Sequence, residues 1–367
     1  MKIITLVGTR PEIIRLSETI KNLDRFFQHR LIHSGQNPQT YLNDVFFRDL
    51  SLRSPDSTNH VTGSLASQLG STLIFLEEEI RDFRPDALLI LGDTNTALVG
   101  FLAKRYGIIV YHIEAGNRSF DVNVPEETNR RIIDHFADFN LCYSRNAYDN
   151  LLREGLHPRF ISICGSPLPE VIQNNLEAIK DSDILDRLSL ASESFLLVSL
   201  HRQENVDSEE RLRKSLVGIE SVAAELNKKI VMSLHPRTKS KLEQFAIPLS
   251  DRFQAIEPQG FHDFMALQLN AYCTISDSGS ISEEASYLGF PAVTIRDAME
   301  RPEALETGSI ILTGFNESDI YRSIVLARSF GKAPSPEAYQ VMNHSQRVIN
   351  FIQSTWPHAA QWLGKRS

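Results

Sequence analysis

The sequence of 367 residues contains few cysteines and no long apolar segment. The three cysteines, Cys142, Cys164 and Cys273, are scattered without CxxC spacing, so neither a disulfide framework nor a zinc site is indicated. The longest apolar runs, such as residues 195–200, are far shorter than the roughly 20 residues that a membrane-spanning helix needs. The first strand pattern begins at residue 3 and leaves no room for a signal peptide. We therefore expect a cytoplasmic protein without a membrane partner.

The sequence also lacks an excess of basic residues. It has 38 Lys and Arg against 46 Asp and Glu, for a formal net charge of −8. Domains that bind nucleic acid are usually strongly basic, so a nucleic-acid partner is not indicated. An anionic small molecule is still compatible with this balance, because a local group of arginines can bind phosphate in an acidic protein.

Short β-branched and apolar runs alternate with longer amphipathic patterns in the first half of the chain. Strands are predicted at residues 3–7, 30–33, 87–91, 108–112, 139–142 and 160–164. Helices are predicted at residues 12–23, 65–82, 96–105, 126–137 and 145–154. This alternation indicates a parallel sheet covered by helices on both faces.

The same alternation restarts after a polar connector at residues 166–189, with strands predicted at 195–200, 229–233, 253–256, 272–276, 292–295 and 309–312. We therefore predict an α/β protein of two Rossmann-like domains with parallel sheets, residues 1–168 and 169–345. A helical tail is expected over residues 334–364. Residues 346–367 are expected to form a C-terminal helix that crosses back to the first domain. Ligands often bind in the cleft between two such domains, at the carboxyl ends of the strands.

Polar residues follow three of the predicted strands in the first domain. Residues 8–12, Gly-Thr-Arg-Pro-Glu, form a turn into a helix where backbone amides and Arg10 could meet a phosphate; the alternative is a plain turn with a surface arginine. This turn is not GxGxxG, so a nicotinamide cofactor is not indicated. Asp93 and Glu114 follow the next two buried strands. Asp93 could equally cap a helix, whereas a functional role is the favoured interpretation of Glu114.

Further candidates are found along both domains. Glu126 and Arg130 are four residues apart on one helix face, where they could form either part of a site or only a surface salt bridge. In the second domain His201 follows a strand, and residues 276–280 join a strand to a helix that carries Glu284. Small residues in such a turn let phosphate approach backbone amides. The polar run at 296–303 is either part of the site or a solvated loop.

Together these segments resemble the non-hydrolysing UDP-N-acetylglucosamine 2-epimerase family. The matching segments, in order along the chain, are GTRPE (8–12), GDT (92–94), EAG (114–116), PEETNR (125–130), HRQEN (201–205), DSG with EE (277–279, 283–284) and ERPE (300–303). The resemblance implies a GT-B-like arrangement with an active site in the cleft between the domains, no metal, no cofactor and a homodimer. By it, the catalytic residues are Asp93, Glu114, Glu126 and His201, and the UDP-sugar is bound by Arg10, Arg15, Arg130, Ser278, Gly279, Ser280, Glu284 and Arg301.

The chemistry of such a reaction explains the need for several carboxylates. C2 of an amino sugar has no neighbouring carbonyl, so its proton is poorly acidic. UDP can instead leave C1 while a carboxylate takes the C2 proton, which produces a 2-acetamidoglycal. Return of a proton to the other face requires a second acid/base group. Arginines such as Arg10 and Arg130, with His201, would stabilise the departing diphosphate.

Some segments depart from the common form of the family, which has a lysine at Arg15 and a glycine at Ser280. Residues 35–37, 116–121 and 124–130 resemble the branch that converts UDP-2-acetamido-2,6-dideoxy-L-talose into UDP-N-acetyl-L-fucosamine for surface polysaccharides. The alternative is that the protein is a UDP-N-acetylglucosamine 2-epimerase. A GT-B glycosyltransferase, a hydrolysing epimerase and a non-enzymatic sugar-nucleotide sensor are the rival functions.

Overall fold

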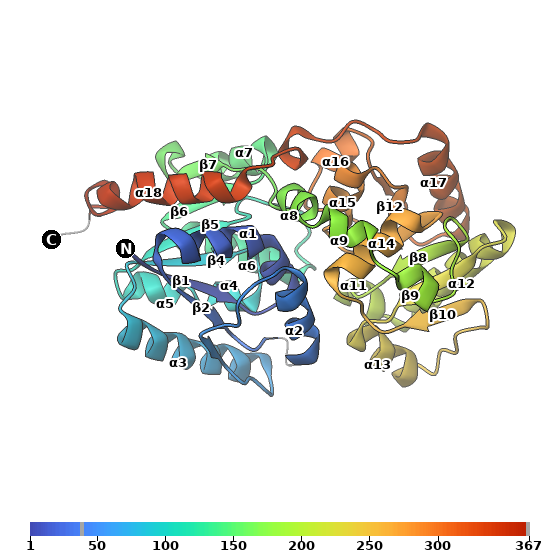
Figure 1. Cartoon of the computed structure of the whole chain (residues 1–367), viewed down its shortest axis with the longest axis horizontal. Coiled ribbons are helices and arrows are strands. Elements are labelled where there is room, and N and C mark those ends of the chain that lie inside the picture. The colour runs from blue at the N-terminus through green and yellow to red at the C-terminus, as the bar shows by residue number, and fades with distance from the viewer. Residues whose placement is uncertain (37–39, 365–367) are drawn as a thin grey trace. The chain divides into compact units, whose positions relative to one another are not determined.

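The computed structural model describes residues 1–36 and 40–364 (Figure 1). The chain divides into two compact units, one of Met1–Gln173 with Gln340–Ser367 and one of Asn174–Tyr339. The domain boundaries predicted from the sequence, between residues 168 and 169 and between residues 345 and 346, remain a prediction. No helix of the described residues is both long and apolar enough to cross a membrane.

The first unit is built on a parallel sheet in the order β3-β2-β1-β4-β5-β6-β7. Its strands are β1 (Lys2–Val7), β2 (Gln28–His33), β3 (Ser57–Thr58), β4 (Ala87–Leu91), β5 (Ile109–Ile113), β6 (Phe139–Cys142) and β7 (Ile161–Ile163). Every residue of β4, β5 and β6 is buried, as expected of central strands covered on both faces.

Nine helices among the described residues belong to the first unit. They are α1 (Arg10–Phe26), α2 (Thr40–Asp49), α3 (Leu65–Phe83), α4 (Asn95–Leu98), α5 (Phe101–Arg105), α6 (Pro125–Phe136), α7 (Arg145–Arg153), α8 (Leu168–Asn174), which ends at the border of the unit, and α18 (His344–Trp362). Helix α18 packs on α1 and β5, so the end of the chain completes this unit (Figure 1). A short 3₁₀ helix, η1 (Pro158–Phe160), precedes β7.

The second unit repeats the pattern with a parallel sheet in the order β10-β9-β8-β11-β12-β13. Its strands are β8 (Phe195–Ser199), β9 (Lys229–Ser233), β10 (Phe253–Ile256), β11 (Cys273–Ser276), β12 (Ala292–Thr294) and β13 (Ile311–Leu312). Its helices are α9 (Leu176–Lys180), α10 (Ile184–Arg187), α11 (Gln203–Val206), α12 (Glu209–Glu225), α13 (Pro236–Gln244), α14 (Phe261–Asn270), α15 (Ile281–Leu288), α16 (Glu303–Glu306) and α17 (Glu317–Phe330), and η2 (Glu337–Tyr339) is a 3₁₀ helix. A buried apolar cluster joins β8, β9 and β11 to α12 and α17.

Several predicted elements differ in the structure. The helix predicted at 96–105 is two helices, α4 and α5, which are separated at Val99 and Gly100. The connector at 166–189 contains α8, α9 and α10 rather than an irregular linker. Helix α2 is not anticipated by the sequence pattern, and the tail helix begins at His344 rather than near residue 334.

Candidate active site

In the first unit the polar segments follow three neighbouring strands, β1, β4 and β5. The strands are parallel, so their carboxyl ends lie at one edge of the sheet, where open α/β sheets bind ligands. Leu91 pairs with Ile113 in register, and the Gly92 amide donates to the Ile113 carbonyl at 2.9 Å. Asp93 and Glu114 therefore leave the sheet from adjacent positions.

The turn after β1 is closed by Glu12 rather than open to an anion. Glu12 Oε2 accepts from the amides of Gly8 and Thr9, both at 2.7 Å, and Oε1 accepts from the Thr94 hydroxyl at 2.6 Å. Burial raises the pKa of Glu12 to about 7, although these hydrogen bonds oppose the shift. The sequence-based idea that these two amides bind phosphate is therefore wrong for this structure, because a carboxylate of the chain already occupies them.

The cation of this turn is Arg10. Its guanidinium carbon lies 5.9 Å from the centre of the Phe46 ring, and it forms no ion pair with the residues that the structure describes. Burial lowers the pKa of Arg10, which is the effect of removing a cation from water. A partly buried arginine without a counter-ion is suited to bind a phosphate.

Glu114 is held in a strained conformation beside a second arginine. Its φ is 71°, a left-handed value that a non-glycine residue adopts rarely and that often marks a functional site. The Arg15 Nη1 atom lies 2.7 Å from Glu114 Oε2, and the Tyr143 hydroxyl donates to the same oxygen at 3.2 Å. This arrangement fixes a carboxylate at the end of β5.

Asp93 is paired with Arg130 of α6, whose Nη2 and Nε atoms lie 2.5 and 3.1 Å from Asp93 Oδ2. Arg130 Nη1 also donates to Glu127 Oε2 at 3.0 Å. The helix α4 is capped by the Thr94 side chain, which accepts from the Ala97 amide, and not by Asp93. The capping alternative for Asp93 is therefore wrong.

Among the described residues, Glu127 at the start of α6 has several partners, whereas Glu126 has none. Glu126 is half-buried and makes no hydrogen bond or ion pair within residues 1–36 and 40–364. Glu127 instead accepts from the Ser119 amide at 2.9 Å and contacts Arg130. Burial alone would raise the pKa of Glu127, but these contacts hold it below its usual value. The acid that remains available for substrate is thus Glu126.

A buried group of polar side chains joins the turns that follow β4 and β5. The His112 ring contacts the Gly92 carbonyl at 2.8 Å through Nε2 and Asp134 Oδ1 at 3.0 Å through Nδ1. Asp134 also accepts from the Gly116 amide and pairs with Arg118 at 2.7 Å. The turns that carry Asp93 and Glu114 are therefore joined through side chains that are almost fully buried.

In the second unit Asp277, which follows β11, organises the segment after the neighbouring strand β8. It is fully buried and accepts from the amides of His201 and Arg202 and from Asn205 Nδ2, at 2.9–3.1 Å. Its Oδ1 also lies 3.3 Å from His201 Nδ1. About a third of the His201 side chain remains exposed, so the ring is oriented by Asp277 and accessible.

The turn that follows Asp277 lies against three charged side chains. A Cβ at Gly279 would lie 2.6 Å from Arg301 Nη1 and from Glu300 Oε1 and 3.4 Å from Arg202 Nη2. Glu300 pairs with Arg202 at 3.1 Å and with Arg296 at 2.7 Å. Arg296, Glu300 and Arg301 are almost fully buried. The alternative of a solvated loop at residues 296–303 is therefore wrong for these three residues.

The helix after this turn places its two acids in different surroundings. Glu283 faces Arg301 at 3.4 Å, whereas Glu284 Oε2 accepts from Gln268 Nε2 of α14 at 2.7 Å. Ser278 and Ser280 share a hydrogen bond between their hydroxyls at 3.0 Å. The predicted residues Ser278, Gly279, Ser280, Glu284 and Arg301 thus occur together in this unit.

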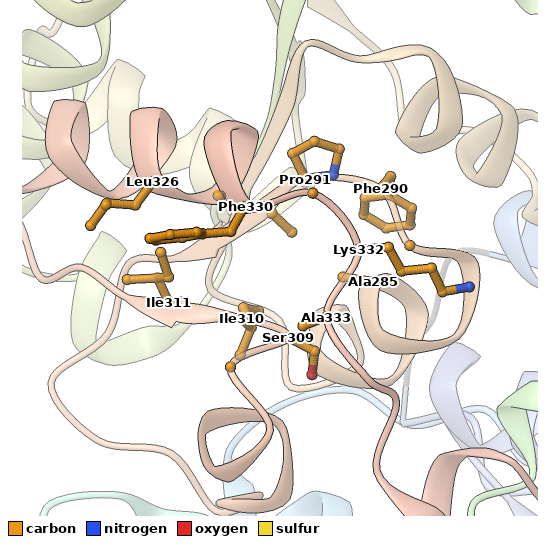
Figure 2. A pocket seen from close by; sticks show the side chains of 15 residues that line it. Ala285, Phe290, Pro291, Ser309, Ile310, Ile311, Leu326, Phe330, Lys332 and Ala333 are labelled. Atoms are coloured by element: carbon orange, nitrogen blue, oxygen red, sulfur yellow. The ribbon is translucent and has the colours of Figure 1, made fainter.

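Neither a metal cluster nor the pocket of Figure 2 belongs to these sites. Within the described part of the chain, no group of three or more His, Cys, Asp or Glu is arranged to hold a metal ion. The pocket in Figure 2 is lined by apolar side chains such as Phe290, Ile310 and Phe330, with Lys332 at its side. It includes Gly289–Ala292 at the amino end of β12, opposite the strand ends described above.

The comparisons with known proteins agree on one family. Residues 21–353 match the family described as UDP-N-acetylglucosamine 2-epimerase. The UDP-N-acetylglucosamine 2-epimerase of Methanocaldococcus jannaschii is 36% identical over 334 residues, which cover 88% of this chain and 91% of that protein. This chain belongs to the UDP-N-acetylglucosamine 2-epimerase family.

Other members and their structures extend the match. The UDP-2,3-diacetamido-2,3-dideoxy-D-glucuronate 2-epimerase of Pseudomonas aeruginosa is 32% identical over 359 residues, 96% of this chain and 99% of that protein. The crystal structure of the Methanocaldococcus jannaschii epimerase in complex with UDP-GlcNAc and UDP has a TM-score of 0.90 and 33% identity, covering 96% of this chain and 100% of that one. A structure from Rickettsia bellii also has a TM-score of 0.90, at 36% identity, and covers 98% of both chains.

The family membership makes this protein an isomerase with two parallel-sheet α/β domains in a GT-B-like fold. Within the first unit the structure brings Asp93 to Arg130 and Glu114 to Arg15, while Arg10 and Glu126 stand apart from these pairs. The sequence analysis does not identify Tyr143, His112, Asp134 or Gln268 as parts of these sites. A polar residue directly after a buried strand is a signal that could have identified Tyr143. Asn37, in the segment 35–37, lies outside the described residues.

Proposed function

We propose that this epimerase inverts C2 of a UDP-2-acetamido sugar by elimination of UDP and its re-addition. The observation that carries the proposal is the pair of carboxylates, Asp93 and Glu114, at adjacent strand ends, each held by an arginine. Their spacing along one sheet edge suits them to act on one small substrate. Glu126, which has no partner among the described residues, adds a third acid.

In the elimination step the C1–O bond to UDP and the C2–H bond break, and the C1–C2 bond becomes a double bond. The proton passes to a carboxylate, and UDP leaves with the electron pair of the C1–O bond. Return of a proton to the opposite face of C2, from a second acid, allows UDP to attack C1 again. The isomer has the same mass, and no redox partner is consumed.

The remaining proposed residues bind the nucleotide. Arg10 and Arg301 provide cations for the diphosphate, and His201 is oriented by Asp277 for the same role. Gly279 leaves room for a phosphate oxygen beside Arg301. Glu284, oriented by Gln268, is suited to accept from the ribose hydroxyls.

We propose UDP-2-acetamido-2,6-dideoxy-L-talose as the substrate, on the resemblance of residues 116–121 and 124–130 to that branch. UDP-N-acetylglucosamine is the second candidate, because relatives at 36% and 38% identity carry that name. A 6-hydroxyl without a hydrogen-bonding partner would cost about 1–3 kcal/mol on burial.

A panel of UDP-amino sugars, with the products identified by NMR, tests the proposal. The expected result is a C2 epimer of unchanged mass, with higher kcat/KM for the 6-deoxy-L-talo sugar. Equal or higher kcat/KM for UDP-N-acetylglucosamine would reject the branch assignment alone. Release of free sugar and UDP would instead indicate a hydrolysing enzyme, and binding without turnover would indicate a sensor.

A further inference from the structure

Tyr143 is a polar residue of the first unit to which neither the sequence motifs nor the proposed reaction assigns a role. It directly follows β6, as Glu114 directly follows the neighbouring strand β5, and Ile113 pairs with Leu141 in register. The amides of Glu114 and Ala115 both donate to the Leu141 carbonyl, at 3.0 and 3.3 Å. The left-handed turn at Glu114 therefore lies against the end of the strand that carries Tyr143.

The Tyr143 side chain is almost fully buried and directed at the catalytic carboxylate. Its hydroxyl donates to Glu114 Oε2 at 3.2 Å, the oxygen that Arg15 Nη1 contacts at 2.7 Å. One carboxylate oxygen thus receives an uncharged donor and a cationic donor from two different elements, the end of β6 and helix α1.

The ring of Tyr143 is held in place by its neighbours. The Arg15 guanidinium carbon lies 5.9 Å from the ring centre, and the His344 ring of α18 contacts it edge-on at a centroid distance of 6.0 Å. His344 is fully buried and contacts the Gly165 carbonyl through Nδ1 at 2.9 Å. Such packing fixes the hydroxyl relative to the strained Glu114.

We infer that Tyr143 is a positioning residue for Glu114, which together with Arg15 fixes the orientation of this carboxylate at the end of β5. This inference rests on the proposed function. A reacting group must be held close to its productive geometry by neighbours that are themselves fixed. Tyr143 meets this condition without adding a second positive charge beside Glu114.

The variant Y143F tests the inference because it removes the hydroxyl and keeps the ring. Hydrogen bonds to charged groups are strong, so kcat should fall about tenfold or more. The KM for the UDP-amino sugar should change much less than kcat, because the lost hydroxyl orients a reacting group rather than binding the nucleotide. The Kd for UDP should remain unchanged.

Tyr111 provides a matched control. It lies on β5 in the same unit, is fully buried, and its hydroxyl contacts Thr355 Oγ1 at 2.8 Å. The variant Y111F loses a buried tyrosine hydroxyl of the same kind away from Glu114. It should show a similar change in thermal stability but an unchanged kcat.

A second measurement separates this inference from the proposed function. The orientation of the Glu114 carboxylate can be compared in crystal structures of wild type, Y143F and Y111F without any substrate. A displaced or multiple conformation of this carboxylate in Y143F alone would support the inference, even if no UDP-amino sugar were epimerised. The same conformation in all three proteins, or a Y143F enzyme with the wild-type kcat, would overturn it.

Discussion

Substitution of Gly279 by alanine should weaken UDP binding without unfolding the protein. Its backbone φ is not in the left-handed region, so alanine is tolerated by the backbone itself. The added Cβ would lie 2.6 Å from both Arg301 Nη1 and Glu300 Oε1, whereas ordinary contacts begin at 3.4 Å. These two side-chain ends must each retreat by roughly 1 Å, a displacement large enough to impair a positioned group.

The expected size of the effect follows from the hydrogen bond to phosphate that would be weakened or lost. A charge-assisted hydrogen bond contributes about 1.5–3 kcal/mol, and 1.4 kcal/mol corresponds to a tenfold change in Kd. We therefore expect the Kd for UDP, measured by isothermal titration calorimetry, to rise about 10- to 100-fold in G279A. At saturating substrate kcat should change much less, because the proposed catalytic carboxylates belong to the first unit.

Gly70 in α3 is a suitable control, because a Cβ there would meet no atom within 4 Å. Alanine is favoured over glycine in a helix interior by about 1 kcal/mol, so G70A should raise stability and leave the Kd unchanged. A folded G279A protein that binds UDP as tightly as wild type would refute the assignment of this turn to the phosphates.

Three further predictions follow from the same sites. D93N, E114Q and E126Q should each lower kcat by about 10²–10⁴-fold, the usual range for loss of an acid/base group, whereas R10A should mainly raise the Kd for UDP; near-normal turnover of the folded acid variants would contradict this. Activity should persist in EDTA, since the proposed site uses arginines to bind the diphosphate, and a loss restored by a divalent ion would oppose that view. Burial lowers the pKa of His344 to about 4, below its ordinary 6.5, so the unfolded chain binds this proton first as the pH falls. Because of this group, the free energy of unfolding should decrease by up to about 1.4 kcal/mol for each pH unit between pH 6.5 and 4. Measured by urea denaturation, this free energy should depend less on pH in H344N, and an unchanged pH dependence would contradict the prediction.

Strand periodicity predicts the two sheets of this protein well. The strands at 87–91, 139–142, 229–233 and 253–256 coincide with β4, β6, β9 and β10. The first three are almost entirely buried, as expected of short apolar runs in a parallel sheet. The break at Gly100 could not be predicted in the same way, because the amphipathic pattern at 96–105 continues through it.

The candidate site shows the same limit. Motif spacing identifies Asp93 and Glu114 as residues at strand ends, but not their partners. Arg130 lies on the same helix as Glu126, yet it pairs with Asp93, 37 residues earlier in the chain. Glu12 closes its own turn as part of a capping box with Thr9, a local pattern that the sequence analysis does not use, and only its contact with Thr94 depends on the tertiary fold.

Deuterium incorporation tests the central claim most directly. The enzyme is incubated in deuterated water with UDP-2-acetamido-2,6-dideoxy-L-talose and, separately, with UDP-N-acetylglucosamine, and the sugar ring is examined by NMR. Elimination followed by protonation from the opposite face predicts that the epimer carries deuterium at C2 and at no other ring position. Prolonged incubation should also release some 2-acetamidoglycal and UDP. An epimer that retains its original hydrogen at C2, or that is labelled at C4, would contradict the mechanism.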